Sequence, residues 1–237
     1  VMGDPLTLSN LQEYLELAHK YGFEVELTTS GYFLDRVSFN TLFHPSVRQI
    51  NISLNSYNKN SLNLSFDDYM SRVLKLCEEK LLNHSKPFIN LRLWNFDEAC
   101  SEVEYNTLLL ESLSSFFDMR LSSEELYKTR PKSLRLASKV LLNFDTYFEW
   151  PSMHSTHYSQ GTCYGLKSHI AILADGRVVP CCLDGDGVIN LGDLNTTALS
   201  DILNSFRAQE MIKGFAQGKA VEELCLKCSY KDRFSDS

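Results

Sequence analysis

The sequence predicts an α/β fold followed by a small, cysteine-rich α+β domain, and three observations support this prediction. Segments typical of strands alternate with helical segments over the first two thirds of the 237-residue chain. A polar, loop-like stretch at residues 153–162 then interrupts the pattern. After it come a short hairpin, a helix and five cysteines, four of which are spaced like metal ligands. We therefore expect two domains, at residues 1–152 and 153–237.

Strands and helices alternate along the first domain. Four segments have the alternation or the β-branched and aromatic content of strands: residues 23–28, 48–54, 87–94 and 139–150. Four others are expected to be helices: residues 11–20, 32–42, 66–82 and 102–117. Because parallel neighbours need a crossover connection, this order predicts a mostly parallel sheet. Polar residues gather at the strand ends, which is the edge where such sheets bind ligands.

The second domain is predicted to contain a hairpin and a helix. Asp175-Gly176 separates two short strands at residues 168–173 and 177–180, and an Asp-Gly pair between strands favours a tight hairpin turn. A helix at residues 199–215 leads to Cys225-Leu226-Lys227-Cys228. So small a core would gain stability from a bound metal.

Composition and charge narrow the classes of function. The formal net charge of −7 argues against nucleic-acid binding, which needs a surplus of Lys and Arg. No stretch approaches the roughly 20 apolar residues that span a bilayer, and no secretory signal opens the chain, so no membrane partner is expected. Seven cysteines, an odd number, do not indicate a disulfide framework. We expect a cytoplasmic protein.

Four cysteines are spaced like the ligands of one metal centre: Cys163, Cys181, Cys225 and Cys228. Thiolates at such spacings hold an iron–sulfur cluster or a tetrahedral zinc ion, and the number of ligands alone fits both. Cys182 is the alternative ligand at the hairpin, where the spacing favours Cys181. A redox-active dithiol at Cys225 and Cys228 is a third interpretation, although no thioredoxin-like βαβ context surrounds it.

The cysteine segment resembles the SPASM/Twitch extension of radical S-adenosylmethionine (radical SAM) enzymes. That family's opening motif is Cys, nine to fifteen residues, Gly, four residues, Cys. Here twelve residues separate Cys163 from Gly176, and four separate Gly176 from Cys181. Leu191-Gly192-Asp193-Leu194 and a helix leading to the Cys-x2-Cys motif follow the same layout. Full SPASM domains carry further cysteines after that motif, so the resemblance implies one auxiliary 4Fe–4S cluster here.

The first domain is similar to the second half of a radical SAM barrel. Met2-Gly3-Asp4-Pro5 resembles the Gly-Gly-Glu-Pro loop that holds the amino group of S-adenosylmethionine, so Asp4 is expected to accept hydrogen bonds from that ammonium. Ile52-Ser53-Leu54-Asn55-Ser56 resembles the strand whose end contacts the ribose or carboxylate of the cofactor. The resemblance thus implies cofactor contacts from Gly3, Asp4, Pro5, Ser53 and Asn55, and it identifies no catalytic residue.

The family's Cys-x3-Cys-x2-Cys loop, which ligates the catalytic cluster, is missing from this sequence. In the family it precedes the Gly-Gly-Glu-Pro loop. Cys77 and Cys100 do not replace it, because they are far apart and lack a third partner. We expect that the chain lacks the first strands and the cluster loop of a longer protein.

For the full-length protein the resemblance implies an iron–sulfur oxidoreductase of the radical SAM class. A reduced 4Fe–4S cluster in such an enzyme cleaves S-adenosylmethionine to a 5′-deoxyadenosyl radical, which abstracts hydrogen. Family members with this extension often modify peptides or proteins, so a peptide or protein substrate and an electron donor are the expected partners. The alternative is a non-catalytic, zinc-stapled binding module on an α/β scaffold.

Overall fold

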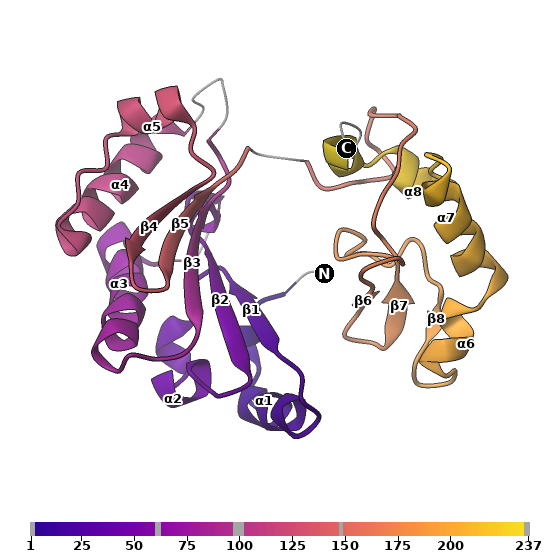
Figure 1. The fold of residues 1–237 in the computed structure, drawn as a ribbon, viewed down its shortest axis with the longest axis horizontal. Helices are drawn as coiled ribbons and strands as arrows, with labels where there is room; N and C mark the ends of the chain where they lie inside the picture. Colours follow the sequence, from indigo (N-terminus) through magenta and orange to yellow (C-terminus); the bar gives the residue numbers. More distant parts are fainter. Residues whose placement is uncertain (1–2, 60–62, 97–101, 147–148, 235–237) are drawn as a thin grey trace. The chain divides into compact units, whose positions relative to one another are not determined.

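The computed structural model describes residues 3–59, 63–96, 102–146 and 149–234 (Figure 1). The chain divides into two compact units: the first is Asp4–Tyr147, and the second is Phe148–Ser237 together with Val1–Gly3. This division lies a few residues before the expected domain boundary at 152/153, which stays a prediction. None of the helices in the described ranges is long and apolar enough to cross a membrane.

The first unit is built on a five-stranded sheet in the order β1-β2-β3-β5-β4. Its strands are β1 (Val25–Thr29), β2 (Val47–Ser53), β3 (Phe88–Leu93), β4 (Ser133–Ala137) and β5 (Val140–Phe144). β1, β2, β3 and β5 are parallel neighbours, and β4 runs antiparallel to β5. The prediction of an α/β fold with a mostly parallel sheet is confirmed.

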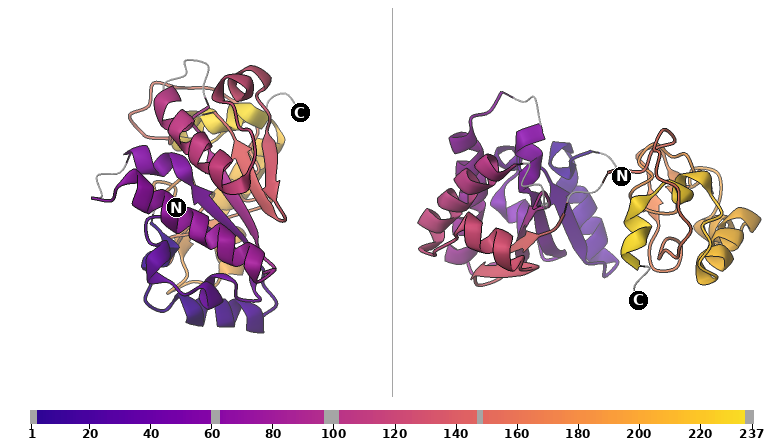
Figure 2. Two further views of the ribbon diagram at one scale, coloured as in Figure 1. Left: turned by 90° about the vertical axis from the view of Figure 1, so that its left-hand side faces the viewer. Right: turned by 90° about the horizontal axis from the view of Figure 1, so that it is seen from above.

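Helices pack against one face of this sheet. They are α1 (Leu11–Lys20), α2 (Phe39–Leu42), α3 (Phe66–Leu82), α4 (Val103–Phe117) and α5 (Ser123–Thr129), with 3-10 helices η1 (Pro5–Thr7), η2 (Leu34–Arg36) and η3 (Leu54–Lys59). Viewed from their side, α3 and α4 lie in front of the strands (Figure 2). Alternate strand residues such as Ile52 and Leu91 are fully buried against Leu76 of α3 and Leu109 of α4. Burial of this apolar face holds the layers together.

Two features of the first unit differ from the sequence prediction. β4 and helix α5 were not expected, and the strand expected at residues 139–150 ends at Phe144. β4 and β5 form a hairpin whose turn includes Lys139 with a φ of 58°. Because glycine or asparagine normally occupies such a position, the turn has no recognisable sequence signal. The helix expected at residues 32–42 is divided between η2 and α2.

The second unit has a small antiparallel sheet and several short helices. The sheet has the order β6-β7-β8, formed by β6 (Ala171–Ile172), β7 (Arg177–Val179) and β8 (Gly192–Asp193). The helices are α6 (Leu199–Leu203), α7 (Phe206–Ala216), α8 (Glu223–Leu226) and the 3-10 helix η4 (Ser229–Phe234). The helix expected at residues 199–215 breaks at Ser205, whose side chain caps α7 by accepting a hydrogen bond from the N–H of Ala208.

Candidate metal centre

The second unit brings the four predicted cysteines into one region. Cys181 lies two residues after the end of β7, Cys225 lies in α8, and Cys228 lies between α8 and η4. Cys163 and Cys225 pack against the same core, which contains Met211, Phe215 and Leu224. Burial raises the pKa of the Cys225 thiol, and the neighbouring thiols of Cys181, Cys163 and Cys228 raise it further. Thiols from three separate segments therefore influence one another's ionisation.

Backbone N–H groups oppose the effect of burial at these sulfurs. Burial raises the pKa of Cys181 to about 11, and hydrogen bonds from backbone N–H groups lower it. At Cys228 the same two effects compete, again with burial the larger. The pairs are Gly165 to Cys163 (3.4 Å from N to Sγ), Leu183 and Asp184 to Cys181, and Tyr230 and Lys231 to Cys228. Such bonds favour the thiolate form, so the donor set fits a thiolate-ligated group such as an iron–sulfur cluster.

Cys181 and Cys182 occupy different environments. Cys182 is exposed, whereas Cys181 is partly buried and its thiol lies close enough to Cys163 for the two to interact electrostatically. The environment therefore favours Cys181 as the ligand at the hairpin, as the spacing does. Within the described ranges, no three His, Cys, Asp or Glu side chains converge closely enough to bind a single metal ion directly.

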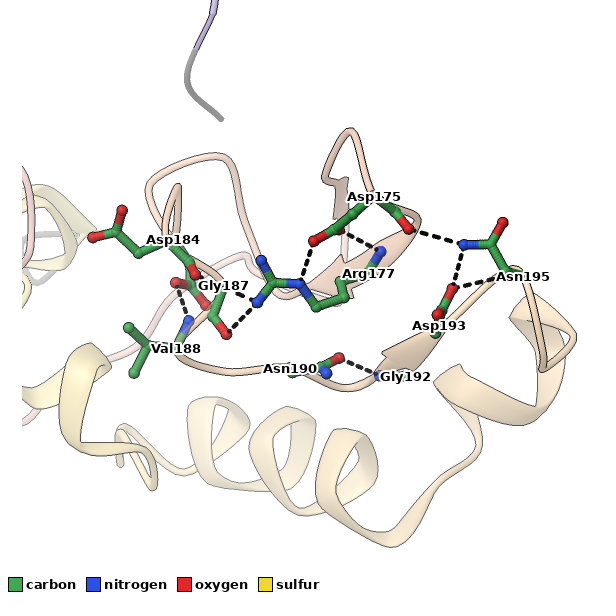
Figure 3. A network of polar contacts seen from close by, with 10 residues as sticks. Asp175, Arg177, Asp184, Gly187, Val188, Asn190, Gly192, Asp193 and Asn195 are labelled. Atoms are coloured by element: carbon green, nitrogen blue, oxygen red, sulfur yellow. Dashed lines mark hydrogen bonds and ion pairs between the residues drawn. The ribbon is translucent and has the colours of Figure 1, made fainter.

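A polar network fixes the hairpin that precedes Cys181 (Figure 3). Arg177 forms an ion pair with Asp175, at 2.7 Å from Nε to Oδ2, and Nδ2 of Asn195 donates to the Asp175 carbonyl at 2.8 Å. Gly176, which lies between Asp175 and Arg177 in the chain, has a φ of +94°, and a Cβ atom there would clash with the side chain of Asn195. The glycine of the motif is thus required by backbone conformation and by close approach.

Buried Asp184 organises the turn that follows Cys181 (Figure 3). Its two carboxylate oxygens accept hydrogen bonds from the N–H groups of Val188 and Ile189, both at 2.8 Å. The Asp184 residue is 2% exposed, and its bond to Ile189 is buried, whereas its bond to Val188 is partly buried. The carboxylate closes a turn that carries a cysteine and its N–H donors.

We expect Asp184→Ala to destabilise this turn by about 2–4 kcal/mol, because one buried and one partly buried N–H group lose a charged acceptor. Hydrogen exchange measured by mass spectrometry should show faster exchange over residues 184–191. Asp186→Ala, at an exposed position in the same turn, is the matched control and should change stability by less than about 0.5 kcal/mol. Equal exchange rates in the two variants would contradict this role for Asp184.

In the first unit, the predicted cofactor residue Asp4 is hydrogen-bonded to the carboxyl end of β1. Its Oδ1 accepts hydrogen bonds from the N–H of Leu6 (3.0 Å) and Oγ1 of Thr29 (2.9 Å). Its Oδ2 accepts from Thr29 Oγ1 (2.8 Å) and from the N–H (2.8 Å) and hydroxyl (2.7 Å) of Ser30. Both oxygens thus have protein donors, so the carboxylate holds the loop that contains Gly3 and Pro5. The expected contact with a cofactor ammonium stays a prediction.

Ser53 and Asn55 lie at the same edge of the sheet as the Asp4 loop. Ser53 is the last residue of β2, and Asn55 follows in η3. Thr29, which donates to Asp4, pairs with Ile52, the neighbour of Ser53, across the parallel β1–β2 ladder. The sheet therefore places the predicted cofactor residues of both segments at the carboxyl ends of adjacent strands. Met2 lies outside the described residues.

Sequence reasoning missed a row of polar side chains across three strands. Asn51 donates to Oγ1 of Thr28 at 3.4 Å, and Asn90 donates to Oδ1 of Asn51 at 3.2 Å. Oδ1 of Asn90 is a buried acceptor that lacks a hydrogen-bond partner within the described part of the chain. The signal available in the sequence was the alternation of polar residues in β2 and β3, which places these side chains on one face of the sheet.

The remaining cysteines outside the second unit do not add to the candidate centre. Cys77 is fully buried in α3, and burial raises the pKa of its thiol to about 12. It is a core residue, as its position in the predicted helix suggested. Cys100 lies outside the described residues.

One family model covers the cysteines of this site, and two solved structures are similar to the chain. Residues 163–229 match the SPASM family, an iron–sulfur cluster-binding domain. Streptococcus suis SuiB, in a crystal structure bound to the precursor peptide SuiA, is similar in fold at 14% identity, with a TM-score of 0.53 over 98% of this chain and 60% of that chain. A structure of BtrN in an open conformation is similar at 14% identity, with a TM-score of 0.40 over 94% of this chain and 79% of that chain. A search of curated proteins gave no match.

Residues 163–229 thus form an iron–sulfur cluster-binding domain of the SPASM type. The chain spans 60% of the length of SuiB. The SPASM match agrees with the resemblance noted for the cysteine segment, and the likeness to SuiB is one of fold.

Proposed function

We propose that the chain is part of a radical SAM enzyme, an iron–sulfur oxidoreductase that uses a 5′-deoxyadenosyl radical to abstract hydrogen. Residues 1–152 form a partial radical SAM barrel, and residues 153–237 form the SPASM-like domain. The observation that carries the proposal is the grouping of Cys163, Cys181, Cys225 and Cys228 inside the segment that matches SPASM.

The four cysteines are the proposed ligands of one auxiliary 4Fe–4S cluster. When bound, such a cluster supplies one-electron redox chemistry. Binding needs the thiolate form, and metal binding therefore displaces the thiol protons that burial favours at Cys181 and Cys225. The backbone N–H donors at Cys163, Cys181 and Cys228 prepare the site for that negative charge.

The first unit supplies part of the proposed S-adenosylmethionine site. Its proposed contacts are Gly3, Asp4, Pro5, Ser53 and Asn55, of which Asp4 and Ser53 lie at the carboxyl edge of β1 and β2. Asp4 fixes the loop through Thr29 and Ser30, as the hydrogen bonds above show. In the full-length protein a catalytic 4Fe–4S cluster completes this site.

The proposed substrate is a peptide or protein, and an electron donor is the second partner. SuiB, whose fold this chain shares, was crystallised with a precursor peptide. That likeness supports the proposal for this chain's substrate class.

Metal analysis after anaerobic purification tests the cluster assignment. We expect about four irons and four acid-labile sulfides per chain, which correspond to one 4Fe–4S cluster bound by four cysteines. The alternative is a zinc-stapled binding module, and one zinc per chain without sulfide would favour it and contradict the cluster. Aerobically prepared protein, from which the cluster is lost, is the control for adventitious iron.

A further inference from the structure

A lysine is buried directly behind the Cys-x2-Cys motif. Lys231 lies in η4, and its side chain is 2% exposed. Its Nζ donates to the carbonyl of Cys228 at 2.8 Å and to the carbonyl of Leu226 at 3.2 Å. Burial of an ammonium is costly unless neighbouring groups compensate the charge. Here two backbone carbonyls of the cysteine loop provide most of that compensation.

The nearest carboxylate to Lys231 is shared with other groups. Oδ1 of Asp232 is 3.9 Å from Nζ of Lys231 and also accepts a hydrogen bond from the hydroxyl of Ser159 at 2.9 Å. Its Oδ2 lies 3.1 Å from Nε2 of His157. Asp232 is partly exposed and lies farther from Nζ than the two carbonyls of the cysteine loop, so the closest partners of the Lys231 charge belong to that loop.

The stem of Lys231 also contacts the loop that carries Cys163. A Cβ built on Gly161 would lie 3.7 Å from the Cγ, Cδ and Cε atoms of Lys231, so the stem runs along the backbone there. The loop is joined to the Cys-x2-Cys motif a second time, because the N–H of Ser159 donates to the Leu226 carbonyl at 3.0 Å. Lys231 thus lies between two of the three segments that supply cysteines.

We propose that Lys231 is a positioning residue that holds two ligand loops together and sets the reduction potential of the auxiliary cluster. The inference rests on the proposed function, because it needs a cluster on these cysteines. Potentials of iron–sulfur clusters depend on net charge, hydrogen bonds to sulfur and exposure to solvent. A buried ammonium beside Cys228 stabilises the more negative, reduced cluster, so its removal lowers the potential.

Three variants of the 237-residue chain separate charge from packing. Lys231→Gln removes the charge and keeps an N–H donor, Lys231→Met removes both, and Lys231→Arg keeps the charge. Lys213→Met is the matched control, because Lys213 is exposed on α7 in an ion pair with Glu210. Iron and sulfide are quantified first, and the midpoint potential is then measured by anaerobic spectroelectrochemical titration.

We expect Lys231→Gln to keep its iron and to be about tenfold harder to reduce at a fixed potential, which equals about 59 mV for a one-electron couple. Lys231→Arg and Lys213→Met should stay close to the wild type. Loss of iron from both neutral variants but not from Lys231→Arg also supports the positioning role. An unchanged potential in iron-replete Lys231→Gln, or loss of iron from all three Lys231 variants, overturns it. Absence of iron and sulfide from the wild type instead rejects the proposed function.

Discussion

Cys225→Ala is expected to abolish iron binding and to unfold much of the second unit. The thiol of Cys225 is partly buried and interacts with the thiols of the three other predicted ligands. Its side chain also packs against the core around Met211 and Leu224. In small metal sites the binding free energy is largely folding free energy, and for structural zinc it reaches roughly 10–16 kcal/mol. Iron per chain should therefore fall from about four to less than one.

The matched control is Cys182→Ala, which removes an exposed thiol from the same unit. It should keep full iron and sulfide, together with the circular dichroism spectrum of the wild type. Colorimetric iron analysis of both variants, prepared anaerobically side by side, checks the expectation. Iron retained in Cys225→Ala would exclude that cysteine as a ligand, and iron lost from Cys182→Ala would assign the hairpin ligand to Cys182 instead of Cys181.

Local sequence signals were sufficient to predict much of the first unit. Helix α3 begins and ends where the sequence predicts, because Ser65 caps it by accepting from the N–H of Asp68 and an apolar stripe runs along it. The parallel sheet followed from strands separated by long helices. The β4–β5 hairpin was missed because Lys139 occupies the left-handed conformation that turn rules assign to glycine or asparagine.

For the candidate metal centre, the sequence predicts the proposed ligands but not the groups that surround them. Cysteine and glycine spacing identified Cys163, Gly176 and Cys181, because the backbone conformation at the glycine constrains the residue type. The burial of Asp184 and Lys231 was not predictable, because charged residues are exposed in most proteins. Their partners are backbone groups, which carry no residue identity and leave no trace in the sequence.

Asp4→Ala is expected to destabilise the first unit by about 2–4 kcal/mol, because it removes a carboxylate that accepts from several donors at the end of β1. Thr29 is 2% exposed, and its hydroxyl loses its acceptor together with the N–H of Ser30. The loop at residues 3–8 should then separate from the strand end. Urea denaturation measures the loss of stability, and hydrogen exchange over residues 5–8 and 29–31 locates it.

Asp35→Ala is the matched control, since it removes a carboxylate of the same unit that pairs with Arg72 at 2.8 Å in an exposed position. Exposed ion pairs contribute at most about 1 kcal/mol, so this variant should be close to the wild type in both measurements. Asp4→Asn should fall between the two, because one acceptor oxygen remains to bind Thr29 or Ser30. Equal losses of stability in Asp4→Ala and Asp35→Ala would contradict the stabilising role of the Asp4 carboxylate.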